Sequence, residues 1–158
     1  GSRGLGDVYK RQVKDNKVLL AEKKRGFGVG KINGVGGKIE LGESIEQGMI
    51  RETFEEINVK PINYEQRAVI HFSLFYKGEW AKEDTYVFVA SDYQGIIQES
   101  EEMKPQWFNI DEIPFDKMFS GDKLWVGELL KGKHFEAFVD FDKDFNTKSF
   151  DIKFDDEK

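Results

Sequence analysis

Three glutamates, Glu52, Glu55 and Glu56, are spaced so that a helix would carry them all on one side. At about 100° per residue they fall within an arc of roughly 100°. Such a face is either a solvated acidic surface or a binding surface for a hard divalent cation, which prefers oxygen ligands. Carboxylates in the last turns of a helix lie at the negative end of its dipole, which is unfavourable unless a cation is bound there. The position of these acids therefore favours a site for Mg²⁺.

The residues around the acids predict the helix that must carry them. Ser44 and Gln47 form a capping-box pattern, so the helix begins at Ile45. Asn58 tolerates the left-handed conformation that ends many helices, so the last helical residue is about Ile57. The acids thus occupy the second half of a helix that follows a glycine-rich loop.

Elsewhere, apolar patterning predicts strands, one further helix and turns. The predicted strands cover residues 18–21, 68–76, 85–91, 135–141 and 149–154, and the further helix covers 124–130. A loop containing Lys77 and Gly78 joins the second and third of these strands, and residues 99–105 indicate a charged loop.

The glycine-rich loop and the helix after it resemble the signature of the Nudix hydrolases. That signature places a Gly, a Glu, an Arg-Glu pair and a Glu-Glu pair at fixed spacings. The matching positions in this chain are Gly37, Glu43, Arg51, Glu52, Glu55, Glu56 and Val59. Thr53 replaces the usual aliphatic residue and Asn58 replaces the usual terminal Gly, and neither position is a metal ligand. The flanking segments, from about Lys17 onward, are similar to the MutT-type branch, which includes the animal oxidised purine nucleoside triphosphatases.

This resemblance implies an α/β fold, namely an α/β/α sandwich with a mixed central sheet and a catalytic loop-helix-loop. We expect residues 13–158 to form a single domain, since the chain is long enough to bury one core. Residues 1–12 begin with Gly-Ser and lack the apolar alternation of a first strand, so we interpret them as non-native or disordered. An ordinary variable N-terminus is the alternative.

The resemblance also implies how the acids divide their work. Glu52, Glu55, Glu56 and Glu102, with the backbone carbonyl of Gly36, would hold Mg²⁺ or Mn²⁺. Glu56, Glu52 and Glu102 are the candidate catalytic residues, and Glu56 is the candidate general base. Gly37, Glu43 and Arg51 would have a structural role, in which Arg51 pairs with Glu43 and holds the loop against the helix.

Seven further residues are candidates for substrate binding by the same resemblance. They are Lys23, Phe27, Asn33, Phe72, Phe119, Asp122 and Trp125. From the residues alone, the segment around Phe27 and Asn33 is equally a flexible surface loop, and Phe72 and Trp125 are equally core residues. Where the animal enzymes have a Trp and two adjacent Asp residues, this chain has Phe119, Gly121 and Asp122.

The implied reaction is Mg²⁺-dependent hydrolysis of oxidised purine nucleoside triphosphates, of the 8-oxo-dGTP or 2-hydroxy-dATP type, to a monophosphate and pyrophosphate. Its role would be sanitation of the nucleotide pool. One alternative is a Nudix pyrophosphatase for another nucleoside diphosphate derivative, such as a dinucleotide or ADP-ribose. Another is a Nudix module that binds nucleotides without hydrolysing them. The complete set of acids argues against the binding module.

Composition narrows the class of partner. The chain has 24 basic and 30 acidic residues, and its net charge of −6 argues against binding of duplex nucleic acid. No apolar run approaches the roughly 20 residues of a membrane span, and no signal-peptide pattern opens the chain. We therefore expect a cytoplasmic monomer that acts on a small-molecule nucleotide, with no nucleic acid polymer and no membrane as partner.

Overall fold

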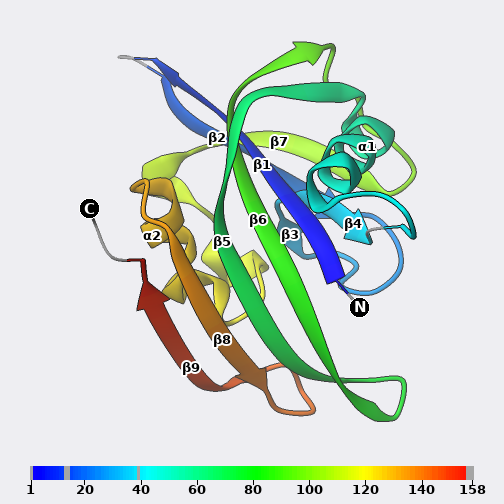
Figure 1. Cartoon of the computed structure of the whole chain (residues 1–158), viewed down its shortest axis with the longest axis vertical. Helices are drawn as coiled ribbons and strands as arrows, with labels where there is room; N and C mark the ends of the chain where they lie inside the picture. The colour runs from blue at the N-terminus through cyan, green and yellow to red at the C-terminus, as the bar shows by residue number, and fades with distance from the viewer. Residues whose placement is uncertain (1, 13–14, 39, 156–158) are drawn as a thin grey trace.

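The computed structural model describes the backbone of residues 2–12, 15–38 and 40–155, and the side chains within 16–35 and 40–155. In this described part, nine strands form a single sheet (Figure 1). The strands are β1 (Ser2–Gln12), β2 (Asp15–Lys23), β3 (Ile32–Asn33), β4 (Val35–Lys38), β5 (Val59–Tyr76), β6 (Glu79–Gly95), β7 (Met103–Asn109), β8 (Phe135–Phe141) and β9 (Thr147–Phe154).

The strand order is β3-β2-β1-β6-β5-β8-β9, with β4 beside β1 and β7 beside β2. Strands β1 and β6 run parallel, as do β5 and β8, and the remaining pairs are antiparallel. The sheet is therefore mixed, as the sequence predicted. The helices are α1 (Ile45–Ile57) and α2 (Val126–Leu130), and short 3₁₀ turns cover Ile110–Glu112, Phe115–Lys117 and Asp122–Leu124.

Strand β2 shows why helices cover both faces of the sheet. Its Leu20 belongs to a buried cluster that includes Leu129 of α2, whereas the adjacent Leu19 belongs to a second buried cluster that includes Ile57 of α1. Successive side chains of a strand point to opposite faces, so a strand that is apolar at every position must be covered on both. Figure 1 shows α1 and α2 on opposite sides of the sheet, which is the predicted α/β/α arrangement.

Helix α1 begins and ends where the sequence predicted. The Ser44 side chain accepts a hydrogen bond from the Gln47 backbone N–H, and the Gln47 side chain accepts one from the Ser44 N–H, so the capping box is complete. Asn58 has a φ of 67°, and its N–H donates to the Phe54 carbonyl. These caps fix the register of the acidic residues on the helix.

Strands β5 and β6 are longer than predicted. They cover Val59–Tyr76 and Glu79–Gly95 rather than residues 68–76 and 85–91. The register shifts between Gln66 and Ala68, which is a bulge. An extra residue breaks the alternation with a period of two, so the sequence pattern hides the first half of β5.

The N-terminal segment and residues 103–109 also differ from expectation. Residues 2–12 form β1, which pairs with β2, β4 and β6, so disorder is wrong for this backbone. Its side chains lie outside the described residues, and its non-native origin stays a prediction, as does the division at residue 13. Residues 103–109 form strand β7 rather than continuing a loop, because Trp107 packs against one core cluster and Phe108 against the other.

His71 ties three strands together on the surface of the sheet. Its Nδ1 lies 2.6 Å from Asp84 Oδ1 on β6, and its Nε2 lies 2.6 Å from Glu136 Oε2 on β8. Burial lowers the pKa of His71, but the hydrogen bonds and the charges of the two carboxylates outweigh it, so the pKa is raised. An imidazole that faces a carboxylate on both nitrogens needs both N–H groups, so it is charged.

We expect this contact to make stability depend on pH. A raised pKa in the folded state means that the stabilisation is complete below the unfolded pKa of about 6.5 and is lost as the pH rises through the folded value. Urea titrations at pH 6 and pH 9 should show about 1 kcal/mol more loss in the wild-type protein than in His71→Asn. His134→Asn is the control because it leaves the contacts of His71 with Asp84 and Glu136 intact. Equal pH dependence in wild type and His71→Asn would contradict the prediction.

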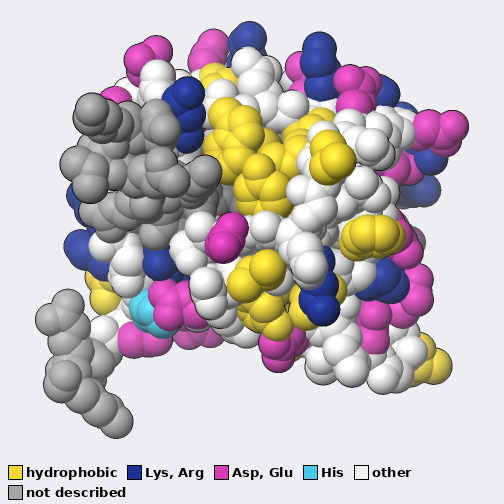
Figure 2. All heavy atoms as spheres, turned by 90° about the horizontal axis from the view of Figure 1, so that it is seen from above, with side chains coloured by type: hydrophobic (Ala, Val, Ile, Leu, Met, Phe, Trp, Pro, Cys, Tyr) yellow, Lys and Arg dark blue, Asp and Glu magenta, His cyan; other side chains and the backbone are white. Residues whose placement is uncertain are grey.

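The surface carries acidic and basic side chains around a central group of hydrophobic ones on the face seen from above (Figure 2). In the described ranges, no helix is both long enough and apolar enough to cross a lipid bilayer.

Candidate active site

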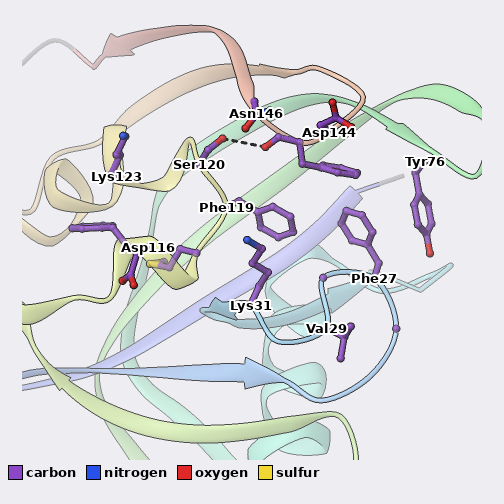
Figure 3. Close-up of a pocket in the computed structure, with 15 residues that line it drawn as sticks. Phe27, Val29, Lys31, Tyr76, Asp116, Phe119, Ser120, Lys123, Asp144 and Asn146 are labelled. Atoms are coloured by element: carbon purple, nitrogen blue, oxygen red, sulfur yellow. Dashed lines mark hydrogen bonds between the residues drawn. The ribbon is translucent and has the colours of Figure 1, made fainter.

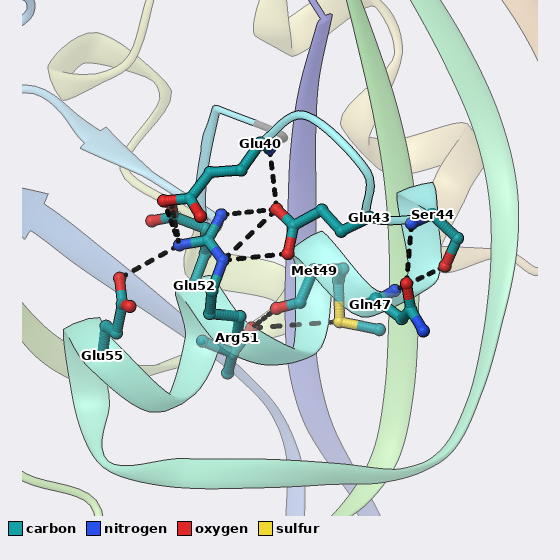
Figure 4. Close-up of polar contacts among 9 residues, drawn as sticks. Glu40, Glu43, Ser44, Gln47, Met49, Arg51, Glu52 and Glu55 are labelled. Carbon is teal, nitrogen blue, oxygen red and sulfur yellow. Dashed lines mark hydrogen bonds and ion pairs between the residues drawn. The ribbon is translucent and has the colours of Figure 1, made fainter.

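Arg51 joins the glycine-rich loop to α1 (Figure 4). Its Nη2 lies 2.7 Å from Glu43 Oε1 and its Nε lies 3.0 Å from Glu43 Oε2, so the predicted contact is present and bidentate. The Glu40 backbone N–H also donates to Glu43 Oε1, at 2.7 Å. The hydrogen bonds from Arg51 and from the Glu40 N–H lower the pKa of Glu43 to about 2. The loop before α1 is thus fastened to the middle of the helix.

The same guanidinium reaches two of the predicted metal ligands. Arg51 Nη1 lies 2.8 Å from Glu52 Oε1 and 3.1 Å from Glu55 Oε2. The Glu52 side chain is 16 % exposed and the Glu55 side chain 58 %. Figure 4 shows the guanidinium enclosed by carboxylates on several sides, so this end of α1 already attracts a positive group.

Glu56 differs from its neighbours on α1 because it is buried, with 6 % of its surface exposed. Thr53, at 0 %, is buried beside it, and its hydroxyl donates to the Met49 carbonyl at 2.7 Å. A buried carboxylate is costly unless it serves another group, so Glu56 is the acid of this helix whose position most requires a function.

Glu102 lies immediately before β7, which packs against α1. Arg25 Nη2 lies 2.6 Å from Glu102 Oε1, and Lys23 Nζ lies 3.8 Å from Glu102 Oε2. The hydrogen bond from Arg25 is the main cause that lowers the pKa of Glu102. The structure therefore places the predicted nucleotide-binding Lys23 beside the predicted ligand Glu102, although 79 positions separate them in the sequence.

A pocket opens on the α2 side of the sheet, with a volume of about 910 Å³ (Figure 3). Its walls come from the loop 26–31, the segment 115–123, Tyr76 and the turn between β8 and β9. The Phe27 and Phe119 rings are nearly parallel, with their centroids 5.7 Å apart and an interplanar angle of 18°. A pair of parallel rings on separate loops is suited to stacking on a planar base.

Comparison with known proteins identifies the family. The NUDIX domain model matches residues 8–129. The chain belongs to the Nudix family. It is a Nudix hydrolase by this match and by the relatives that it resembles.

Two curated relatives and one solved structure support the assignment. The chain is 43% identical over 129 residues to the oxidized purine nucleoside triphosphate hydrolase of Danio rerio, covering 82% of this chain and 81% of that protein. It is 38% identical over 141 residues to the Mus musculus protein of the same name, covering 89% of each. The crystal structure of a MutT protein from Bacillus halodurans superposes with a TM-score of 0.82 at 26% identity, covering 96% of this chain and 97% of that one.

Nudix hydrolases generally use a divalent metal ion. Within 16–35 and 40–155, no three acidic or histidine side chains converge on one point as a metal site. The donor chemistry nevertheless fits a hard cation, because Glu52 and Glu55 present only oxygens and already share one positive nitrogen of Arg51. Glu52, Glu55, Glu56 and Glu102 as a metal-binding set stays a prediction.

Two glycines of the Nudix signature, Gly36 and Gly37, lie on β4, next to α1. The structure describes only their backbone, and the side chains of residues 36–39 lie outside the described part. The assignment of the Gly36 carbonyl as a metal ligand and the structural role of Gly37 therefore stay predictions.

Of the predicted substrate-binding residues, Phe27 and Phe119 line the pocket. Phe72 lies deeper, stacked on Phe141 at 5.8 Å, and Phe141 in turn lies 6.1 Å from Phe119. Asn33 pairs with β2 on strand β3. These rings form a continuous contact from the core to the pocket.

Trp125 is 4 % exposed and belongs to the core cluster beneath the pocket. The structure thus has the core position that the sequence left as one of two possibilities, and a contact of Trp125 with substrate stays a prediction. Asp122 is 5 % exposed, and this burial raises its pKa to about 7. Lys31 partly offsets the rise by its charge.

Gly121 shows why this chain lacks an acid at the position before Asp122. A Cβ on Gly121 would lie 3.0 Å from Val139 Cγ1 and 3.2 Å from Thr147 Oγ1. The Thr147 hydroxyl is itself engaged by Ser120 Oγ at 2.8 Å. A side chain at position 121 would therefore require β8 and β9 to shift.

The sequence analysis missed several pocket residues, above all Lys31, Tyr76 and Phe145. Lys31 Nζ lies 5.8 Å from the centre of the Phe119 ring, and the Phe145 ring lies 5.4 Å from that of Phe27. No local motif marks these residues, since each reaches the pocket from a different turn. Their meeting depends on the tertiary structure.

Proposed function

We propose that this Nudix hydrolase cleaves oxidised purine nucleoside triphosphates, of the 8-oxo-dGTP type, to the monophosphate and pyrophosphate. The observation that carries the proposal is the 43% identity, over 82% of the chain, to a protein named for that activity. The parallel rings of Phe27 and Phe119 support it, because they offer a surface for a purine. Nucleotide-pool sanitation would be the role of such an enzyme.

At the phosphate end, we assign Glu52, Glu55, Glu56 and Glu102, with the Gly36 carbonyl, to hold Mg²⁺, or Mn²⁺ in its place. The bound metal would screen the negative oxygens of the phosphoanhydride and help to orient it. Glu56 is our candidate to accept the proton of the attacking water, because its buried side chain is kept in place by α1. Lys23 lies close enough to Glu102 to approach the same phosphates.

At the base end, Phe27 and Phe119 would stack on the purine. The Asn33 side-chain amide offers both a donor and an acceptor to a base edge. Asp122 offers either one, because a carboxyl with a pKa of about 7 donates when protonated and only accepts when ionised. The ring contacts give affinity for any purine, and the polar groups give the discrimination among them.

The test is initial-rate cleavage of 8-oxo-dGTP, 2-hydroxy-dATP, dGTP and ADP-ribose with Mg²⁺, with products identified by mass spectrometry. We expect an oxidised purine to have a kcat/KM at least about tenfold above that of dGTP, since one polar contact is worth 1–3 kcal/mol. Chelation with EDTA should abolish turnover, and Mg²⁺ or Mn²⁺ should restore it.

Cleavage of ADP-ribose in preference to all three triphosphates would retain the Nudix chemistry and reject the base-reading assignment. Binding of the nucleotides without turnover would favour a non-catalytic module. A cytoplasmic location, a monomeric state and the lack of a nucleic acid or membrane partner stay predictions, which fractionation and light scattering can check.

A further inference from the structure

Tyr76 stands at the end of β5, on the face that forms the α2-side core. Ile70 and Leu74, which precede it at intervals of two, are buried in that core, and Phe72 packs against it. Side chains two residues apart share a face of a strand, so Tyr76 continues this row to the rim of the pocket. It is 41 % exposed and lines the pocket.

The backbone around Tyr76 is held firmly. Lys77 and Gly78 have φ values of 52° and 80°, and they connect Tyr76 directly to its partner Glu79. Two successive residues with positive φ form the type of turn that matches the twist of a hairpin. Tyr76 is therefore fixed by the register of β5 and β6.

The opposite face of the same hairpin is also anchored. The rings of Phe75 and Trp80 meet edge to face at 5.3 Å, and Lys143 Nζ, from the turn after β8, lies 5.1 Å from the centre of the Phe75 ring. These contacts join the hairpin to the β8–β9 turn. The hairpin thus provides a rigid mount for Tyr76.

Phe27, by contrast, lies on a glycine-rich loop. Gly26, Gly28 and Gly30 all have positive φ, and glycine there leaves the backbone with many accessible conformations. A Cβ on Gly28 would lie 3.2 Å from Phe119 Cζ, so the loop lies directly against that ring. The ring of Phe27 must therefore be positioned by its neighbours.

Two of those neighbours flank Phe27 on opposite sides. Figure 3 shows Phe27 between Phe119 and Tyr76, and the Phe27 and Tyr76 centroids lie 4.7 Å apart at an angle of 66°. A purine that enters between Phe27 and Phe119 needs a separation of about 7 Å, two layers of about 3.5 Å each, where the structure has 5.7 Å. Phe27 must move outward, toward Tyr76, when a base enters.

We propose that Tyr76 is a positioning residue for base binding, whose ring limits the outward movement of Phe27 and presses it onto the purine. The inference rests on the proposed function, because it takes the ligand to be a purine nucleotide. Tyr76 acts through Phe27 and not on the phosphates. Its effect should therefore fall on KM and not on kcat, and it should be alike for oxidised and unmodified purines.

The test compares Tyr76→Ala and Tyr76→Phe with the wild-type protein, using 8-oxo-dGTP and dGTP. We expect Tyr76→Ala to raise KM for both about threefold to tenfold, the value of one aromatic pair, with kcat within about twofold. Tyr76→Phe should restore the wild-type KM because the ring is retained. Trp80→Ala is the matched control, since it removes a ring from the same hairpin outside the pocket lining.

A double-mutant cycle makes the mechanism specific. In a Phe27→Ala background, Tyr76→Ala should raise KM no further, because the ring that it positions is gone. Calorimetry with 8-oxo-dGMP should show the same pattern in Kd without any turnover. An independent increase in both backgrounds would overturn the positioning role, as would an unchanged KM in Tyr76→Ala beside an active wild type. Wild-type protein that neither binds nor cleaves these nucleotides would instead reject the proposed function, and this assignment with it.

Discussion

Glu56→Gln should lower kcat for the preferred nucleotide by about 10²-fold to 10⁴-fold while leaving the fold intact. The amide has nearly the shape of the carboxylate, so the buried position of Glu56 should accept it without a cavity. The charge is lost, however, and with it the ability to hold a metal ion and to take a proton from water. Steady-state kinetics at saturating Mg²⁺, beside thermal unfolding of both proteins, measures the two effects separately.

Glu46→Gln is the matched control for this change. Glu46 lies in the first turn of the same helix, is exposed, and accepts a hydrogen bond from the Tyr64 hydroxyl rather than facing the acidic end. We expect its kcat to stay within about threefold of the wild-type value, because surface substitutions away from a site have small effects. A Glu56→Gln enzyme as fast as this control would falsify the assignment of Glu56 as the catalytic acid.

Asp122→Ala should have the second largest effect. If Asp122 reads the base, its removal should lower kcat/KM for the oxidised purine by roughly tenfold to 150-fold, the value of one buried polar contact of 1–3 kcal/mol. Asp122→Asn should retain more activity, because it keeps a donor and an acceptor. Rates measured with 8-oxo-dGTP and dGTP would show whether the loss is specific to the oxidised base.

The pKa of Asp122, raised to about 7 by burial, adds a dependence on pH. The ratio of kcat/KM between two purines should change between pH 6 and pH 8 in the wild-type protein and stay constant in Asp122→Asn. Stability has the opposite sign from His71 in origin. A buried acid keeps its proton in the folded state, so its contribution to stability falls as pH rises from about 4 to about 7. Equal losses for both nucleotides and a flat ratio in wild type would show that Asp122 only supports the loop.

The sequence determined the acidic helix most fully. Helix α1 has the predicted bounds, the capping box joins Ser44 to Gln47, and Asn58 has the left-handed conformation. The Arg51 contact with Glu43 is also present as predicted. These features are local or lie within a motif of fixed spacing, and short-range geometry decides them.

The fold class was also accessible from the sequence. The mixed sheet, the two covered faces and the Nudix family agree with the resemblance in the motif. The lengths of β5 and β6 were not, because the bulge at Gln66 interrupts their alternation. Nor was strand β7, whose Pro105 and charged neighbours concealed a pattern that alternates between two cores.

The pocket is where the tertiary structure decided most. Phe27 was predicted as a base contact, but the turn that brings Tyr76 against it is 49 positions away, and Phe145 comes from a third segment. Local propensity cannot show which turns meet, since that depends on how β5, β6, β8 and β9 pair and curve. The sequence therefore determined the chemistry at the phosphate end, through residues on one helix, whereas the packing of separate loops determined the shape of the site for the base.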